Sequence, residues 1–244
     1  MHARAHLIFL ILNMVFFVDL FLAGISGIPY VSTFGLSEFG RGTWFMFFGI
    51  MGLISWTRYT NYSKGLRGEE QVSDYLKSRL SEEYFLINDV TLPGGYGNID
   101  HIILSRNMVF VLETKNNGGR VKFYGANWNL GRRSPVTQVY QNAAALNSII
   151  KDSRILTRPR VPFIEGLVVF LKAEITKSDP ETPVYTLTDL PERIHGLAGD
   201  TEQYSCEELD KINKYIMTIA EKIESEENRF VRIIWRDFRG LLNL

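Results

Sequence analysis

The chain has 244 residues, of which 27 are basic and 27 acidic, and a single cysteine, Cys206. One cysteine excludes an intramolecular disulfide and a cysteine-based zinc cluster, and it is in keeping with a reducing compartment. Balanced charge provides no overall attraction to nucleic acid, so a nucleic-acid partner would need a local basic patch.

The N-terminal part of the chain is strongly apolar. Residues 7–30 carry one charge, Asp19, and about 20 apolar residues suffice to cross a bilayer. A second run, about 43–59, is shorter and has tryptophans near its ends, where interfacial aromatics are common. We therefore predict a membrane anchor over residues 1–57, built as a transmembrane helical hairpin. A cleaved signal peptide is the alternative for the first run, and an interfacial or re-entrant segment for the second.

Basic residues near the two runs indicate their orientation. Arg4 precedes the first run, and Arg58, Lys64 and Arg67 follow the second. The positive-inside rule then places both ends in the cytoplasm. We expect a multi-pass protein of the cell inner (cytoplasmic) membrane, with the lipid bilayer as a partner and the rest of the chain cytoplasmic. Asp19 would face the second helix or another subunit, which leaves open a homo-oligomer through the transmembrane helices.

Beyond the anchor, hydrophobic periodicity predicts alternating helices and strands. The expected elements are a helix over 65–80 that begins near Gly68, a strand over 83–93, strands over 98–105 and 108–115 joined by a short turn, a hairpin over 120–131, a helix over 134–152 and a buried strand over 164–172. The order helix, three strands, helix, strand predicts one α/β domain, with a mixed central sheet flanked by helices.

Residues 176–244 are predicted to form a C-terminal extension with amphipathic helices that pack on the domain. One helix is expected over 205–227, where apolar residues recur at helical spacing. The final segment, 228–244, alternates arginines with bulky apolar residues. It is read either as a helix that packs on the domain or as a basic amphipathic element at the membrane surface.

Three charged residues interrupt the apolar strands of this domain. Side chains two apart in a strand share a face, so Glu113 and Lys115 point the same way. Pairing through the turn at 106–107 would place Asp100 opposite Glu113. Two such carboxylates repel each other and shift their pKa values unless a cation lies between them.

Mg²⁺ or Mn²⁺ suits this arrangement, because these ions prefer oxygen ligands and Mg²⁺ keeps several waters. The carbonyl of Thr114 could add a ligand. Lys115 could orient or deprotonate a water, or stabilise charge on a phosphate. A solvated ion pair on an exposed strand face is the simpler interpretation of Glu113 and Lys115 alone. Asp100, which follows a glycine-rich turn, favours the functional one.

Several motifs occur in an order that resembles a known family, the nuclease-related domain (NERD) of the PD-(D/E)xK nuclease-like superfamily. They are "GEEQV" (68–72), "GNIDHIIL" (97–104), "VFVLETKN" (109–116), Trp128, "SPVTQVYQNAAAL" (134–146) and "LVVF" (167–170). The resemblance covers roughly residues 66–172, and we place the nuclease-like domain at 64–175. It implies a restriction-endonuclease-like α-β-β-β-α-β core and metal-dependent cleavage of phosphodiester bonds.

The resemblance also implies roles for particular residues. Asp100 and Glu113 would bind the metal, Lys115 would be the catalytic lysine, and Glu69 would assist the metal or the water. Gln138, with Gln141 one turn on, would face the site from the second helix, since residues three apart share a helix face. Polarity at a helix N-terminus is the alternative for the glutamines.

The residues on either side of Asp100 are His101 and Ile99. His101 points to the opposite strand face and is read as structural. The superfamily's proline before the aspartate is Ile99 here.

A local basic patch near the proposed site could bind backbone phosphates. Its members are Lys115, Arg120, Lys122, Arg132 and Arg133. Nearby aromatic residues, Phe123, Tyr124 and Trp128, either fill the core, which is the favoured reading, or stack on bases.

The sequence thus predicts a membrane-anchored, Mg²⁺-dependent endo- or exonuclease that acts on DNA, with RNA as second choice. One alternative is a catalytically silent, membrane-tethered nucleic-acid-binding or scaffold module. Another is a structural partner of a membrane complex.

Overall fold

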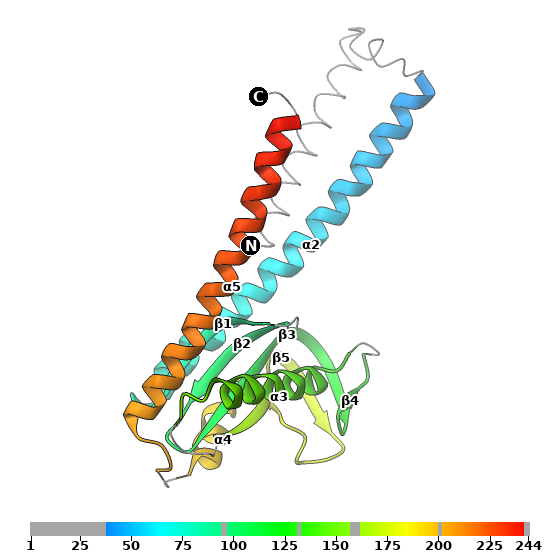
Figure 1. Cartoon of the computed structure of the whole chain (residues 1–244). Coiled ribbons are helices and arrows are strands. Elements are labelled where there is room, and N and C mark those ends of the chain that lie inside the picture. Colours follow the sequence, from blue (N-terminus) through cyan, green and yellow to red (C-terminus); the bar gives the residue numbers. More distant parts are fainter. Residues whose placement is uncertain (1–37, 94–96, 131–132, 157–161, 200–201, 242–244) are drawn as a thin grey trace. The chain divides into compact units, whose positions relative to one another are not determined.

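The computed structural model describes residues 38–93, 97–130, 133–156, 162–199 and 202–241 (Figure 1). The chain divides into two compact units, Met1–Arg67 and Gly68–Leu244, and each is described by itself. The first predicted membrane segment, residues 7–30, lies outside the described residues.

The second predicted membrane segment lies in helix α2 (Glu38–Arg79). Across the ranges described above, none of the helices combines the length and the apolar character that crossing a membrane requires. The prediction of a helix that begins near Gly68 was wrong, because α2 continues through Gly65 and Gly68 without a break. Each glycine costs about 1 kcal/mol relative to alanine in a helix, but no proline interrupts the segment.

A mixed sheet forms the centre of the second unit, as the sequence predicts (Figure 1). Its strands are β1 (Phe85–Leu92), β2 (Gly97–Leu104), β3 (Met108–Tyr124), β4 (Asn127–Trp128), β5 (Phe163–Lys177) and β6 (Val184–Thr186). The order is β1-β2-β3-β5-β6, and β4 pairs with β3. The pairs β1–β2, β2–β3 and β3–β4 are antiparallel, whereas β3–β5 and β5–β6 are parallel.

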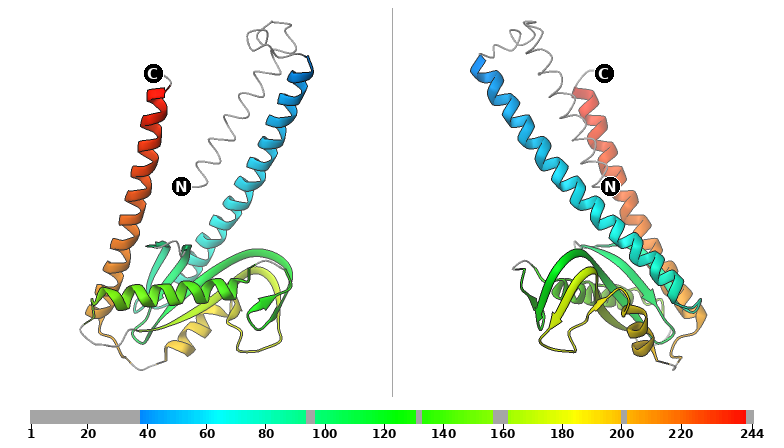
Figure 2. Two further views of the ribbon diagram at one scale, coloured as in Figure 1. Left: turned by 45° about the vertical axis from the view of Figure 1, so that its right-hand side comes forward. Right: turned by 180° about the vertical axis from the view of Figure 1, so that it is seen from behind.

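Helices cover both faces of the sheet. They include α3 (Pro135–Ser153), α4 (Leu190–Ala198) and α5 (Cys206–Leu241), and α3 lies across one face (Figure 2). On that face a core cluster joins α3 to Leu209, Ile212 and Ile216 of α5. A second cluster joins the other face to Val72 and Leu76 of α2 and to α4. The apolar side chains that alternate along β2 and β3 supply both clusters.

Some strands and helices were not predicted at their full extent. Strands β3 and β5 run beyond the predicted 115 and 172, and a bulge lies between Lys115 and Gly118. Strand β6 and helix α4 lie in a segment for which the sequence predicted no specific element. Helix α5 is longer than the predicted 205–227.

Helix α3 approaches β5 closely at Gly166. A Cβ at this glycine would lie 3.0 Å from Val139 Cγ1 and 3.3 Å from the Val139 backbone. Because a backbone atom cannot move aside easily, the glycine fixes how closely the helix and the sheet pack.

We therefore expect Gly166→Ala to lower the free energy of unfolding by about 1–3 kcal/mol, the usual cost of overpacking. The control is Gly196→Ala in α4, where an added Cβ would have no neighbour within 4 Å. It should raise stability by about 0.5–1 kcal/mol. Denaturant unfolding of the full chain measures both, and equal effects would contradict the close contact.

Candidate active site

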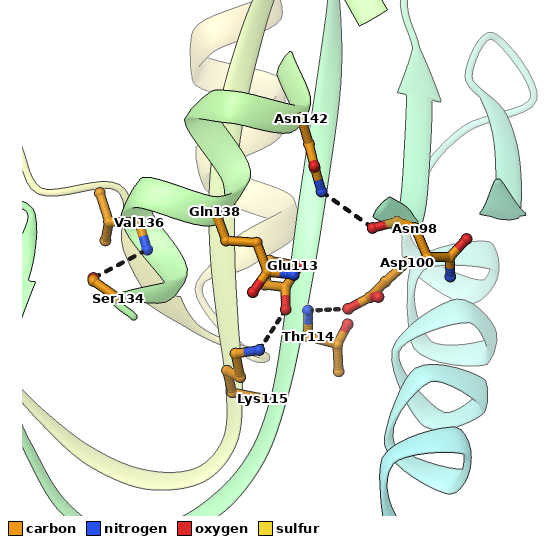
Figure 3. A network of polar contacts seen from close by, with 9 residues as sticks. All are labelled: Asn98, Asp100, Glu113, Thr114, Lys115, Ser134, Val136, Gln138 and Asn142. Carbon is orange, nitrogen blue, oxygen red and sulfur yellow. Dashed lines mark hydrogen bonds and ion pairs between the residues drawn. The ribbon is translucent and has the colours of Figure 1, made fainter. Parts of the chain in front are cut away.

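Asp100 and Glu113 meet where β2 and β3 separate. The strand register pairs His101 with Leu112, so the next step along both strands sets Asp100 against Glu113. There the ladder ends, and the backbone N–H of Thr114 donates instead to Oδ2 of Asp100 at 2.6 Å (Figure 3). The carboxylate thus takes the place of a strand partner and is held beside Glu113.

Glu113 is almost completely buried, with 3% of its surface exposed. Lys115 forms an ion pair with Oε1, and Gln138 Nε2 of α3 donates to Oε2 at 2.7 Å. The Lys115 contact comes from the predicted face of β3, and the Gln138 contact comes from the predicted helix (Figure 3). A buried carboxylate is costly unless it is paired and hydrogen-bonded, and these two partners meet that need.

Burial raises the pKa of both carboxyls. Burial is the main cause for Asp100, and the charge of Glu113 adds to it, so the pKa of Asp100 lies well above its ordinary value. Burial also raises the pKa of Glu113, although Lys115 and Gln138 oppose the shift. Lys115 opposes both shifts without cancelling either of them.

Glu69 lies close enough to interact with the site from α2. Its pKa is raised by burial, and the charges of Asp89 and Glu113 add to the shift while Lys115 opposes it. The preceding Gly68 allows a close approach to β3, since a Cβ there would lie 3.0 Å from Cβ of Asn116. The structure thus brings Asp100, Glu113, Lys115, Gln138 and Glu69 together from four elements.

A polar network that the sequence did not predict lies next to these residues. Asn142 of α3, itself buried, donates to the backbone carbonyl of Asn98 at 3.1 Å (Figure 3). Asn98 Nδ2 in turn donates to Asp89 at 2.7 Å. Asp89 has a left-handed backbone with φ 56° and follows Asn88, which pairs with His101 in the sheet. The β1–β2 register could have pointed to Asp89. Asn88 pairs with His101 and Val90 with Ile99, so Asp89 lies opposite Asp100.

His101 has the structural role expected of it. The side chain is buried, and its Nδ1 lies 2.7 Å from Oδ1 of Asn88. Asn88 Nδ2 donates to Ser73 of α2 at 3.0 Å. Burial lowers the pKa of His101 to about 4, so the ring is neutral near pH 7 and ties the sheet to α2.

The predicted basic patch is only partly available as free charge. Arg120 is exposed and pairs with Glu174 at 2.9 Å, and Lys115 pairs with Glu113. Arg133 is exposed and donates to the neutral Gln141. Arg132 lies outside the described residues.

The aromatic residues of this region divide between core and surface. Phe123 is buried against Phe170 and Trp128, which confirms its core role. Tyr124 is 59% exposed.

The donor set fits a small, hard divalent cation. The buried Glu113 and the half-buried Asp100 face each other with raised pKa values. Oδ1 of Asp100 accepts no hydrogen bond from the described part of the chain. No group of three or more His, Cys, Asp or Glu residues suited to a metal occurs among the described residues. Mg²⁺ commonly binds through one or two carboxylates, with waters and substrate phosphates as the other ligands. Two carboxylates are therefore enough for Mg²⁺, whereas a metal ion whose ligands all come from the protein would need more side chains.

Residues 64–171 match the family model described as NERD, nuclease-related domain. This part of the chain is similar to the nuclease-related domain. The match covers the four elements that carry Glu69, Asp100, Glu113, Lys115 and Gln138. The predicted family resemblance, and with it the nuclease-like character of this domain, is confirmed.

Two known proteins are similar to parts of the chain. An uncharacterized protein of Bacillus anthracis is 32% identical over 103 residues, which covers 36% of this chain and 48% of that protein. The chain thus spans about half the length of this curated relative. The structure of Pyrococcus furiosus SfsA in complex with Ca²⁺ matches with a TM-score of 0.27 and 15% identity, over 52% of this chain and 55% of that one. A similarity at this level carries no argument about the NERD domain.

The raised pKa of Asp100 makes stability depend on pH. A raised pKa means that the folded protein disfavours the charged form, so stability falls as pH rises from about 4 through the raised pKa. We expect Asp100→Asn, without divalent cations, to raise the free energy of unfolding at pH 8 by about 1–3 kcal/mol. The gain should vanish near pH 4, where the wild-type carboxyl is protonated.

Denaturant unfolding between pH 4 and pH 8 in EDTA measures the difference. Asp152→Asn, at an exposed position of α3, removes the same charge and should show no such gain. A variant at Asp100 that is less stable than the wild type at pH 8 would contradict the cost of burying this carboxylate.

Proposed function

We propose that the protein is a membrane-anchored, divalent-metal-dependent nuclease that hydrolyses phosphodiester bonds of DNA, with RNA as second choice, at the cytoplasmic face of the membrane. The observation that carries the proposal is the cluster of the buried Glu113 with the half-buried Asp100 and Lys115, inside the region that matches the nuclease-related domain. A buried and a half-buried carboxylate that share one lysine are a costly arrangement that folding alone does not need. Residues with shifted pKa values are typical of catalytic sites.

Asp100 and Glu113 would hold Mg²⁺ or Mn²⁺. Bound there, such an ion supplies an activated water and neutralises negative charge on a phosphate. Two hydrogen bonds hold these carboxylates in position. The Thr114 N–H orients Asp100, and Gln138 orients Glu113 from α3.

Lys115 and Glu69 would act on the water and on the phosphate. The amino group of Lys115 lies beside Glu113, where it can orient the attacking water or stabilise charge on the phosphate. Burial and neighbouring acids raise the pKa of Glu69, which makes this carboxyl a better proton acceptor for a water at the site.

The membrane anchor is supported by the apolar run over 7–30 and by helix α2. Within α2, apolar side chains more than 40% exposed recur on one side of the helix, at Met46, Phe47, Ile50, Leu53 and Ile54. Large exposed apolar patches mark sites of membrane or protein contact. Recovery of the full chain in the soluble fraction of lysed cells would contradict the anchor.

A catalytically silent, nucleic-acid-binding or scaffold module is the second candidate. It is favoured by the balanced charge after residue 57, where 25 basic and 25 acidic residues occur. Such a surface attracts nucleic acid weakly. A fold alone does not establish catalysis.

Cleavage assays with the full chain separate the two candidates. The purified protein is incubated with circular, linear and single-stranded DNA and with RNA, in Mg²⁺, Mn²⁺ or EDTA. We expect cleavage only with a divalent cation. Nicking of the circle would identify an endonuclease.

We expect Asp100→Asn and Lys115→Met to lower the rate by at least about 100-fold, a usual effect of losing a group that acts on the reacting water. Asp152→Asn serves as the charge-matched control and should cleave like the wild type. Equal cleavage by all four proteins would indicate a contaminant. Nucleic-acid binding without cleavage in any metal would support the silent module instead.

A further inference from the structure

Arg133 is a cation at the edge of the candidate site that the proposed chemistry does not use. It lies immediately before α3, its side chain is exposed, and its Nη2 donates to Oε1 of Gln141. The contact spans eight residues, so the side chain runs along the first two turns of the helix.

The face of α3 along which Arg133 runs borders the carboxylates. Gln141 and Gln138 are three residues apart and share this face. Gln138 itself touches Glu113, at 2.7 Å (Figure 3). The positive charge of Arg133 also interacts with Glu113 and acts to lower the pKa of this carboxyl. The guanidinium is therefore near the carboxylates but outside the buried cluster.

The other cations of this region are differently placed. Glu113 neutralises Lys115, and Glu174 pairs with Arg120. Lys122 lies seven residues beyond Lys115 in β3, about 23 Å along an extended strand. Arg133, in contrast, has a neutral amide as its partner in the described part of the chain, so it keeps its full charge beside the site.

We propose that Arg133 binds a backbone phosphate of the nucleic acid next to the bond to be cleaved, and that Gln141 is a positioning residue that holds the guanidinium there. A guanidinium offers five N–H donors and matches a phosphate in a two-bond contact, so one bond to Gln141 leaves donors for the substrate. An exposed arginine held in place loses less side-chain freedom on binding than an unrestrained one. This inference rests on the proposed function, because it assumes a nucleic-acid substrate.

The test measures binding of the full chain to short fluorescent single-stranded and duplex DNA, at several salt concentrations, with Ca²⁺ or with EDTA. We expect Arg133→Gln to weaken binding about tenfold at low salt, as for the loss of one charge-assisted hydrogen bond. The slope of log K against log salt should fall by about 0.9 for the duplex and about 0.7 for the single strand, the change for one phosphate contact. The matched control is Lys151→Gln, which removes a charge from an exposed position in the last turn of the same helix. It should change neither quantity.

Variants at Gln141 test the positioning role. Gln141→Ala leaves the charge in place, so it should weaken binding less than Arg133→Gln while keeping the salt slope. In the double variant, Gln141→Ala should add nothing to Arg133→Gln. If Gln141 had only a structural role, its loss would lower the unfolding midpoint and leave binding intact, which would overturn this part of the inference.

The outcomes separate this inference from the proposed function. Equal binding and equal slopes for Arg133→Gln and Lys151→Gln overturn the inference, even if the protein cleaves DNA. The expected loss at Arg133 in a protein that never cleaves supports the inference and contradicts the nuclease. No measurable binding by the unaltered protein overturns the inference as well.

Discussion

The buried carboxylate of Glu113 is the constraint on which the site depends. At 3% exposure its charge must be paired, and the partners come from two places. Lys115 is supplied by the same strand face, and Gln138 by helix α3. Helix α3 must therefore start where Gln138 reaches Glu113 of β3, and Gly166 lets the helix body pack closely enough on β5. The pairing of one side chain thus links the packing of a helix to the geometry of the site.

Asp100 on the neighbouring strand is also held in place by a hydrogen bond. Its carboxylate accepts the Thr114 N–H at the point where β2 and β3 stop pairing. A second negative charge is thereby fixed beside Glu113. Two ionised carboxylates and one lysine ammonium leave a net negative charge at the site. In the nuclease we propose, this remaining negative charge is what attracts a divalent cation.

The strand periods and the turn at 106–107 were enough to predict the facing of Asp100, Glu113 and Lys115, because side-chain alternation is a local property. The family resemblance added Glu69 and Gln138, which lie on helices whose docking the sequence does not state. Asp89 and Asn142 were missed, since their contacts depend on a left-handed residue and on helix packing. A helix start near Gly68 was predicted wrongly, because α2 continues through this glycine, which a helix tolerates at modest cost.

Metal binding by the full chain tests the central claim most directly. Calorimetric titration of Mn²⁺ into the wild type, Asp100→Asn and Glu113→Gln reports the ion itself, independently of any substrate. The account predicts saturable binding by the wild type that is lost in both variants and kept in Asp152→Asn. Binding that is equal in all four proteins, or absent from the wild type, would contradict it.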